Sequence, residues 1–520
     1  MFTDKKRTEA QDEIRRRDQV LFAHILTPGL FIQAARLCEL PIILSPLNLI
    51  NLVWLALSAA RNPHLCFADL LGLSLKSLQD NESFPGSLLA KLLNVPDQPR
   101  KKKSRHDPRK NPGESVSEAA FAKARQRMPS AFWVALFFLL GERFQLLHAD
   151  VVRWRRFRLM AIDGTEVTLP DWPALREHFG TANNGAGSHG AHARLVLLQF
   201  PQARLPLAYV LKPIAVGENT MARQLRRGLR RDDLVLLDAG FLCYGLLWQI
   251  HDQDAFFCLR LRKNINLRVI KELSKATGAN DVQVEWAPKD SRGNWRKEGL
   301  AKSITLRLLT YHAAGFRPLR LLTNVLSEQD VPYEQWWGLS LSEQGEVLFK
   351  GAYNLRWEIE TTYLELKVQQ RMEGRLRSRT AEGIDYEVAG HILYYLLVRW
   401  LIVEAAQAAQ VSPLRLSFTA ALREINNQWP AAIVASETWW EQTLRPRLLE
   451  RLASHHAEER PGRTAPRGKK ERRAAKRAKD AKRAKDAKRR PQKKARPRPW
   501  FGQGWNLAGP FVASPVTPQG

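Results

Sequence analysis

The sequence predicts an α/β fold in which a mixed sheet carries helices on its faces, preceded by a helical region and followed by a basic tail. Apolar residues recur at helical spacing up to about residue 150, and strand-like runs then alternate with helical segments. A charged, low-complexity repeat fills the end of the chain. At 520 residues, the chain is long enough for two or more units with at least one substantial core.

The N-terminal region, residues 1–98, is predicted to be helical, because QVLFAHIL, NLINLVWLALSAA and SLLAKLLNV repeat apolar residues at helical spacing. One stretch, residues 40–60, is about as long as a membrane span. It contains two prolines and two asparagines and lacks flanking aromatic residues, so we interpret it as a turn followed by a buried helix, with no membrane involved.

The central region, residues 115–262, begins with two helices that are separated near Pro129 and then changes character. FRLMAID, RLVLLQF and LPLAYVLK are strand-like runs. A helix at NTMARQLRRGL, a strand at DLVLLDAGF, a further helix and a strand at FFCLRLR follow. This order predicts a mixed sheet with helices on its faces.

The rest of the chain divides into three predicted parts. Residues 263–325 contain the strand-like runs VQVEW, SITLRLLTYH and PLRLLTNVL, which predict a β-rich insertion. Residues 326–450 return to helical patterns. Residues 451–520 include AKRAKDAKRAKDAKRR and are predicted to be disordered without a partner.

The net charge of +29 indicates a polyanionic partner such as double-stranded DNA. The excess is concentrated in a basic linker, residues 99–114, and in the tail, where nineteen Lys or Arg residues face three acids between Arg463 and Arg498. Such basic segments can also be exposed to solvent without binding any partner. The four cysteines form no CxxC pair, so neither a zinc site nor a disulfide framework is predicted; this and the charged N-terminus fit a cytosolic protein.

Two aspartates follow strand-like runs: Asp163 in AIDGT and Asp238 in LLDAGF. Carboxylates at the ends of neighbouring strands are hard oxygen ligands that suit Mg²⁺ and phosphoryl transfer. Aspartate is also a common residue where a strand ends. These two residues alone therefore do not decide between a metal site and an ordinary turn.

A third acid comes from YNLRWEIETTYLELK, residues 353–367, which is predicted to be one helix. At about 100° per residue, four side chains share an arc of about 60°: Tyr353, Arg356, Glu360 and Lys367. An apolar stripe lies opposite, at Leu355, Ile359 and Leu366. Glu358 and Glu365 fall away from the polar face and are expected to be bystanders, so Glu358→Ala is expected to do little.

Glu360 is the one glutamate on a face with two cations and a phenol, so it is the predicted third ligand. With Asp163 and Asp238 it would hold two Mg²⁺ ions, with Mn²⁺ able to substitute, which activate water or a 3′-hydroxyl for in-line displacement at phosphorus. Arg356 and Lys367 are expected to bind phosphates, and Tyr353 to donate a hydrogen bond to the DNA backbone.

The pattern Tyr-x2-Arg-x3-Glu-x6-Lys, from Tyr353 to Lys367, resembles the YREK signature of the insertion-sequence-4 group of DDE transposases. Asp163 in DGT and Asp238 in DAGF resemble the first and second acidic motifs of that family. The four-residue signature is specific, whereas DGT and DxGF alone are not. The resemblance covers roughly residues 115–425.

This resemblance implies a ribonuclease-H-like catalytic core that cuts DNA at the terminal inverted repeats of a transposon and joins the ends to target DNA. It implies a divalent metal and a paired-end complex formed by a homodimer in the bacterial cytosol. Trp357 matches a family tryptophan that touches DNA beside the signature arginine. Trp336 or Trp337 is our candidate for a base-stacking tryptophan, although aromatic residues near a sheet are more often part of the core.

Residues 1–98 lie outside the resemblance, and their binding to DNA ends is inferred from position and helicity. The predicted function is therefore that of a DNA transposase. A metal-dependent DNA nuclease of the same fold is the first alternative, and a noncatalytic DNA-binding protein derived from a transposase is the second. The intact acids and signature argue against the second alternative.

Overall fold

The structure is a computed structural model in which the chain divides into two units, residues 1–460 and 461–520. The predictions for the basic linker and for the tail beyond residue 457 lie outside the described residues. The structure describes residues 20–40, 47, 49–67, 69–70, 118–181, 190–262, 265, 267–273, 280–287, 297–312, 318–341, 347–434 and 437–457.

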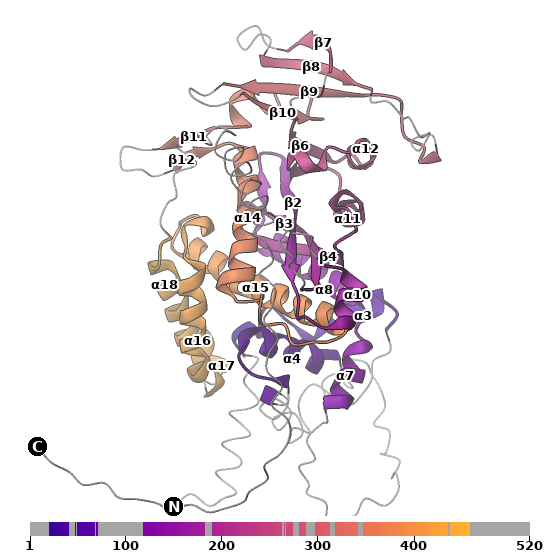
Figure 1. The fold of residues 1–520 in the computed structure, drawn as a ribbon. Coiled ribbons are helices and arrows are strands. Elements are labelled where there is room, and N and C mark those ends of the chain that lie inside the picture. The colour runs from indigo at the N-terminus through magenta and orange to yellow at the C-terminus, as the bar shows by residue number, and fades with distance from the viewer. Residues whose placement is uncertain are drawn as a thin grey trace, which may run out of the picture. The chain divides into compact units, whose positions relative to one another are not determined.

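A ten-stranded sheet organises the first unit, with strand order β4-β3-β2-β5-β6-β10-β9-β8-β7 and with β1 paired to β2 (Figure 1). Its strands are β1 (Arg153–Trp154), β2 (Phe157–Thr168), β3 (His192–Phe200), β4 (Leu205–Pro213), β5 (Asp233–Leu237), β6 (Phe256–Arg260), β7 (Arg268–Glu272), β8 (Asp281–Trp286), β9 (Ile304–Tyr311) and β10 (Leu319–Thr323). A separate hairpin pairs β11 (Leu339–Leu341) with β12 (Val347–Lys350).

Strands β2 to β6 follow the order that the sequence predicts. β5 is parallel to β2 and β6, whereas β3 is antiparallel to β2 and β4. Helices α11 (Glu218–Leu225) and α12 (Tyr244–His251) lie on one side of these strands and α14 (Trp357–Leu364) lies on the other (Figure 1). Every residue of β5 is buried, as expected for a strand covered on both faces. This is the expected ribonuclease-H-like mixed sheet.

The described part of the segment 263–325 contains β7 to β10, and these strands continue the core sheet. β10 pairs antiparallel with β6, with Thr323 opposite Cys258, and β9, β8 and β7 follow outward (Figure 1). The sequence pattern suggested an interruption of the core. The structure shows an extension of the core, because the backbone groups of β6 on that side are paired by β10.

The described N-terminal helices are packed against the helices of the core. They are α2 (Val20–Ala23), α3 (Pro28–Leu37) and α4 (Leu49–Arg61). Helix α4, the buried helix expected from the apolar stretch, lies against α15 (Ala381–Ala408), and α3 lies against α8 (Ser130–Leu147). At Gly390 of α15 a Cβ atom would come within 2.8 Å of the Ala56 carbonyl oxygen, so the close approach of α4 requires glycine there.

Helix α15 is the central helix of the core. Its side chains are buried along most of its length, and Thr380 caps its start by accepting a hydrogen bond from the Gly383 amide. By length and composition α8 and α15 could each cross a membrane, but 94% of the apolar window of α15 is buried inside the fold. The remaining α-helices are α7 (Glu118–Gln126), α9 (Ala149–Val152), α10 (Pro173–Phe179), α16 (Phe418–Val434), α17 (Glu437–Trp439) and α18 (Arg445–Ser454).

Candidate active site

The register of two parallel strands brings Asp163 and Asp238 together. Ile162 of β2 is paired with Leu237, the last residue of β5, and the residue after each is the aspartate. The expectation that both aspartates end their strands is correct for Asp238 and wrong for Asp163, because β2 continues to Thr168 in its pairing with β3. Neighbouring strands lie about 4.8 Å apart, and paired residues direct their side chains to the same face. The two carboxylates that the sequence indicates are therefore neighbours.

A tight turn fixes the carboxylate of Asp238. The residue precedes the 3₁₀ turn η2 (Ala239–Phe241), and its Oδ1 accepts a hydrogen bond from the Gly240 amide. A Cβ atom at Gly240 would lie 2.7 Å from that Oδ1. Glycine at position 240 therefore leaves room for the Asp238 carboxylate to accept the hydrogen bond from the backbone of this turn.

Arg356 joins the first and third predicted acids. Its Nη1 lies 3.3 Å from Asp163 Oδ2, and its Nη2 donates to Glu360 Oε1 over 2.8 Å. The Arg356 side chain is 8% exposed, whereas the Glu360 side chain is 47% exposed. One guanidinium therefore spans the gap between strand β2 and helix α14, and Glu360 reaches solvent at the edge of the site.

The pKa of Asp163 depends on its burial and on the charged groups around it. Burial raises the pKa of Asp163 to about 7. The Gly164 amide and the Arg356 charge lower that pKa, and the negative charges of Asp238 and Glu360 raise it further. The three predicted acids thus interact with one another, and a cation placed among them would stabilise their ionised forms.

A fourth carboxylate, Glu218, lies beside this group and was not anticipated from the sequence. It is the first residue of α11, and a Cβ atom added at Gly164 would come within 2.8 Å of its Oε1. Burial raises the pKa of Glu218, Arg194 lowers it, and the charges of Asp238 and Glu166 raise it again. No local sequence signal marks Glu218, because its position depends on how α11 packs against β2.

The donor set suits a divalent cation, but the acids are not gathered around one point. Among the described residues, no group of three His, Cys, Asp or Glu side chains is arranged to hold a metal ion. Between Asp163 and Glu360 the Arg356 guanidinium provides the positive charge. The assignment of Asp163, Asp238 and Glu360 as metal ligands therefore stays a prediction from their chemistry.

Tyr353 and Lys367 hold the helix segment to the sheet. Tyr353 is 5% exposed, and its hydroxyl donates to the carbonyl of Leu237, the residue before Asp238, over 3.1 Å. Lys367 Nζ lies 3.2 Å from the Thr165 hydroxyl oxygen and 3.1 Å from Glu373 Oε1. The expectation that Tyr353 donates to DNA is corrected, because its hydroxyl is buried and engaged with the strand.

The segment expected to be one helix has three geometries. It begins as the 3₁₀ turn η5 (Ala352–Arg356), continues as α14, and ends as the π-helical turn η6 (Glu365–Gln369). A uniform 100° per residue therefore does not apply at either end. The predicted apolar stripe is nevertheless buried, at Leu355, Ile359 and Leu366.

The expectation that Glu358 and Glu365 are bystanders is wrong. They are 6% and 3% exposed and form a buried ionic cluster beneath α14. Arg204 Nε donates to Glu358 over 2.8 Å, and Arg204 Nη1 donates to Glu365 over 2.8 Å. Their further partners are Lys350, Tyr395 and Arg399. The helical wheel cannot reveal these partners, because they lie on other elements.

The three tryptophans occupy different environments. Trp336 is fully buried, with its ring centre 6.0 Å from that of Trp154, so the expectation that it stacks on a base is corrected. Trp337 packs against Tyr311 at 5.4 Å and is partly buried. Trp357 is 48% exposed, with the Arg356 guanidinium 5.1 Å from its ring centre. Of the three, Trp357 alone is about half exposed, and it adjoins Arg356, which contacts two of the acids.

Residues 154–397, which contain the three predicted acids, match the family model described as the transposase DDE domain. Over this segment the chain is similar to the DDE transposases. Within the matched segment, Asp163 lies inside β2, Asp238 directly follows β5 and Glu360 lies in α14. The match leaves the N-terminal helices and the segment after residue 397 outside it.

Comparison with known proteins gives relatives of the same kind. The chain is 30% identical over 320 residues to the transposase InsG for insertion sequence element IS4 of Escherichia coli (strain K12), covering 58% of this chain and 65% of that protein. It is 27% identical over 160 residues to the putative transposase InsZ of the same organism, covering 30% of this chain and 54% of that protein. The chain thus spans less than two thirds of the length of either relative.

A solved structure, the piggyBac transposase synaptic complex with hairpin DNA, is similar to this chain at a TM-score of 0.30 and 12% identity. The similarity covers 67% of this chain and 66% of that chain. It is too weak to support any statement about this chain, whose fold class rests on its own strand order.

Proposed function

We propose that this protein cleaves DNA at the terminal inverted repeats of an insertion sequence and joins the ends to target DNA. Asp163, Asp238 and Glu360 would form the reaction centre. One observation carries the proposal: the β2/β5 register makes the two aspartates neighbours, and Arg356 ties Asp163 to Glu360. The similarity of residues 154–397 to the transposase DDE domain supports the same chemistry.

The reaction is an in-line displacement at phosphorus, in which water or a 3′-hydroxyl attacks and the 3′-oxygen of the cleaved bond leaves. A bound divalent cation, Mg²⁺ or Mn²⁺, would be held by the three acids and would supply Lewis-acid stabilisation of the attacking and leaving oxygens. The pKa of Asp163 is raised to about 7, chiefly by burial, and a bound cation would favour the ionised carboxylate that ligation requires.

Arg356 would bind the phosphate that is attacked. Its guanidinium is nearly buried and is shared by two carboxylates, and its Nε has no hydrogen-bond partner among the described residues. A planar guanidinium binds a phosphate through two parallel hydrogen bonds. Lys367, anchored beside β2, and the exposed ring of Trp357 would contact the adjoining DNA backbone and bases.

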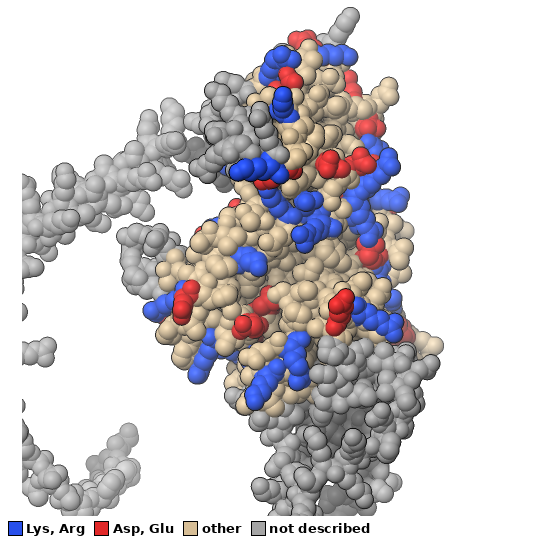
Figure 2. Space-filling model, turned by 90° about the vertical axis from the view of Figure 1, so that its right-hand side faces the viewer, with Lys and Arg blue, Asp and Glu red and all other residues tan. Residues whose placement is uncertain are grey.

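The charged surface supports a DNA substrate. Figure 2 shows a gathering of Lys and Arg side chains near the middle of one face, with fewer Asp and Glu around it. Helices α11 and α12 lie on that side of the molecule (Figure 1). The segment that follows α11 contributes exposed arginines at positions 227, 230 and 231. Such a patch attracts a polyanion without regard to its sequence.

We further propose a homodimer that pairs two transposon ends in the bacterial cytosol, with the N-terminal helices contributing to recognition of the inverted repeats. The test is incubation of the full chain with Mg²⁺ and duplexes that carry the DNA flanking its own gene. Transposition predicts cleavage at the repeat boundary and joined products. Nicking without joining would favour the nuclease, and binding alone would favour the noncatalytic alternative.

A further inference from the structure

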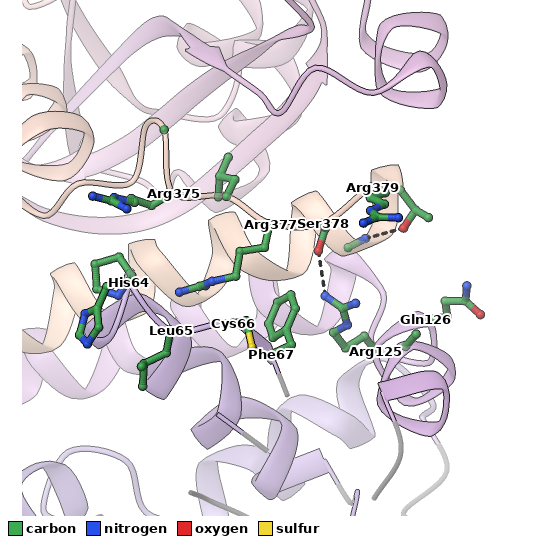
Figure 3. Close-up of a pocket in the computed structure, with 16 residues that line it drawn as sticks. His64, Leu65, Cys66, Phe67, Arg125, Gln126, Arg375, Arg377, Ser378 and Arg379 are labelled. Atoms are coloured by element: carbon green, nitrogen blue, oxygen red, sulfur yellow. Dashed lines mark hydrogen bonds between the residues drawn. The ribbon is translucent and has the colours of Figure 1, made fainter. Parts of the chain in front are cut away.

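An open cavity of about 700 Å³ lies outside the site described above (Figure 3). It is formed by residues 63–67 after α4, by α7 and by the loop 374–380 that leads into α15. Four of its sixteen lining residues are arginines, and none of the sixteen is Asp or Glu. The four arginines are Arg125, Arg375, Arg377 and Arg379. We call this cavity, together with its four arginines, the arginine pocket.

Arg125 is the inner cation of the arginine pocket. Its Nη1 donates to the Ser378 hydroxyl over 2.8 Å, and its guanidinium lies 4.5 Å from the ring centre of Phe67 (Figure 3). Its Nε has no hydrogen-bond partner, and no carboxylate in the described part of the chain forms an ion pair with it. A mostly buried cation without a carboxylate partner favours an anionic ligand.

Arg377 belongs to the scaffold of the pocket. Its Nη2 donates to the carbonyl oxygens of Ala59 over 3.2 Å and Asn62 over 2.8 Å, and its Nη1 lies 3.5 Å from the buried carboxylate of Glu387. These bonds fasten the loop to the end of helix α4. The loop that carries the other arginines is therefore held in place before any ligand arrives.

Arg375 and Arg379 stand at the rim. Both are exposed, and neither forms an ion pair with a carboxylate in the portion of the chain that the structure describes. Arg379 lies 4.1 Å from the ring centre of Trp172. The loop begins directly after Glu373, the partner of Lys367, so it continues from the segment that carries the reaction centre.

The start of α15 also borders the cavity, because Thr380 and Gly383 line it, and Glu382 is the acid in that first turn. The N-terminus of a long helix carries a partial positive charge. Several dispersed arginines in an open cavity suit successive phosphates of one strand better than a single enclosed anion, because each planar fork can take its own phosphate.

We propose that the arginine pocket binds the phosphodiester backbone of the DNA substrate at a place separate from the cleaved bond. This inference rests on the proposed function, which makes DNA the substrate, and it names a surface that holds the strand. Arg125 is the inner phosphate ligand, and Arg375 and Arg379 are rim contacts. Such contacts fix position and affinity but do not read sequence.

The test uses the full chain without divalent metal, so that no cleavage occurs. The double variant Arg375→Gln/Arg379→Gln removes the rim charges. Arg153→Gln/Arg447→Gln removes two exposed arginines, likewise without an ion pair in the described part of the chain, as a matched control. Binding to the end-bearing duplex is measured over a range of salt concentrations. The rim variant should lose about tenfold in affinity, and the slope of log affinity against log salt should fall by about two.

Equal affinities and slopes in the rim and control variants would overturn the inference. Thermal unfolding with inorganic phosphate tests whether the pocket binds a small free anion instead. If phosphate stabilises the wild type but not the rim variant, and both bind DNA equally well, the pocket is a small-anion site. That result would also refute the inference. A wild type that binds the duplex but never cuts it would refute the proposed function and leave the role of the pocket standing.

Discussion

At the scale of single residues, the structure separates side chains that look alike in the sequence. Glu358, Glu360 and Glu365 lie within one short segment, yet only Glu360 reaches solvent beside the two aspartates. The other two are buried ion-pair partners of Arg204. The same segment therefore supplies one candidate reacting group and two groups that hold its own position.

This difference predicts unequal effects on stability. Glu358→Ala should lower the free energy of unfolding by about 3 kcal/mol or more, because it leaves the charges of Arg204 and Lys350 without one of their buried partners. Glu450→Ala, at an exposed position of α18, is the control and should change it by less than about 0.5 kcal/mol. Chemical denaturation measures both. Equal changes would show that the buried cluster does not stabilise α14.

The local sequence pattern was sufficient to propose Asp163, Asp238 and Glu360 together, since apolar runs and helix faces are set by neighbours in the chain, and their role stays a prediction. It was insufficient for Glu358 and Glu365. Arg204, which binds both, lies more than 150 positions earlier in the chain, and Arg399 belongs to α15. Trp336 was misjudged for the same reason, because its burial depends on Trp154.

At the scale of elements, the position of the helix that carries Glu360 depends on the changes in helical geometry at its two ends. The 3₁₀ turn before it places Tyr353 on the carbonyl of Leu237, and the π-helical turn after it places Lys367 beside β2. A sequence pattern does not show such changes, because they follow from contacts with the sheet. The order of strands, by contrast, was predictable from alternating apolar runs.

Glu404 links three elements, and its ionisation is expected to make the stability of the fold depend on pH. Its carboxylate lies 3.1 Å from His24 Nε2 and 3.1 Å from Arg445 Nη2, which joins α15 to the end of α2 and the start of α18. Burial alone would raise the pKa of Glu404, but His24 and Arg445 hold it below its ordinary value. The stability that this ionised group contributes is therefore present above about pH 4.3 and is lost as the pH falls below that value.

Glu404→Gln should accordingly be less stable than the wild type near neutral pH, and the difference should shrink as the pH falls from about 5 toward 3. Unfolding by denaturant at several pH values measures the difference. A difference that stays constant over this range would show that the ionised carboxylate contributes nothing through His24 and Arg445.

At the scale of the whole molecule, the N-terminal helices and the catalytic core form one packed unit. Gly390 of α15 meets Ala56 of α4 across 334 positions of sequence, which no pattern in either helix reveals. The sequence predicted the helices themselves and a separate region for them. Recognition of DNA ends by these helices would therefore be coupled to the core through direct packing.

Residues 461–520 form a separate unit, and their removal tests what the basic tail does. Deletion should leave the thermal unfolding midpoint of the first unit unchanged. It should weaken nonspecific DNA binding and reduce its dependence on salt, because nineteen Lys or Arg residues between Arg463 and Arg498 are lost. Binding to an unrelated duplex at two salt concentrations measures this, and an unchanged affinity would assign the tail no part in DNA binding.

The central claim is that Asp163, Asp238 and Glu360 act together in DNA strand cleavage. The most direct measurement is Mg²⁺-dependent cleavage of an end-bearing duplex by Asp163→Asn, Asp238→Asn and Glu360→Gln, each compared with its own DNA binding. The account predicts that all three variants bind the duplex and that none cleaves it. Cleavage at the wild-type rate by any one of them would contradict the account.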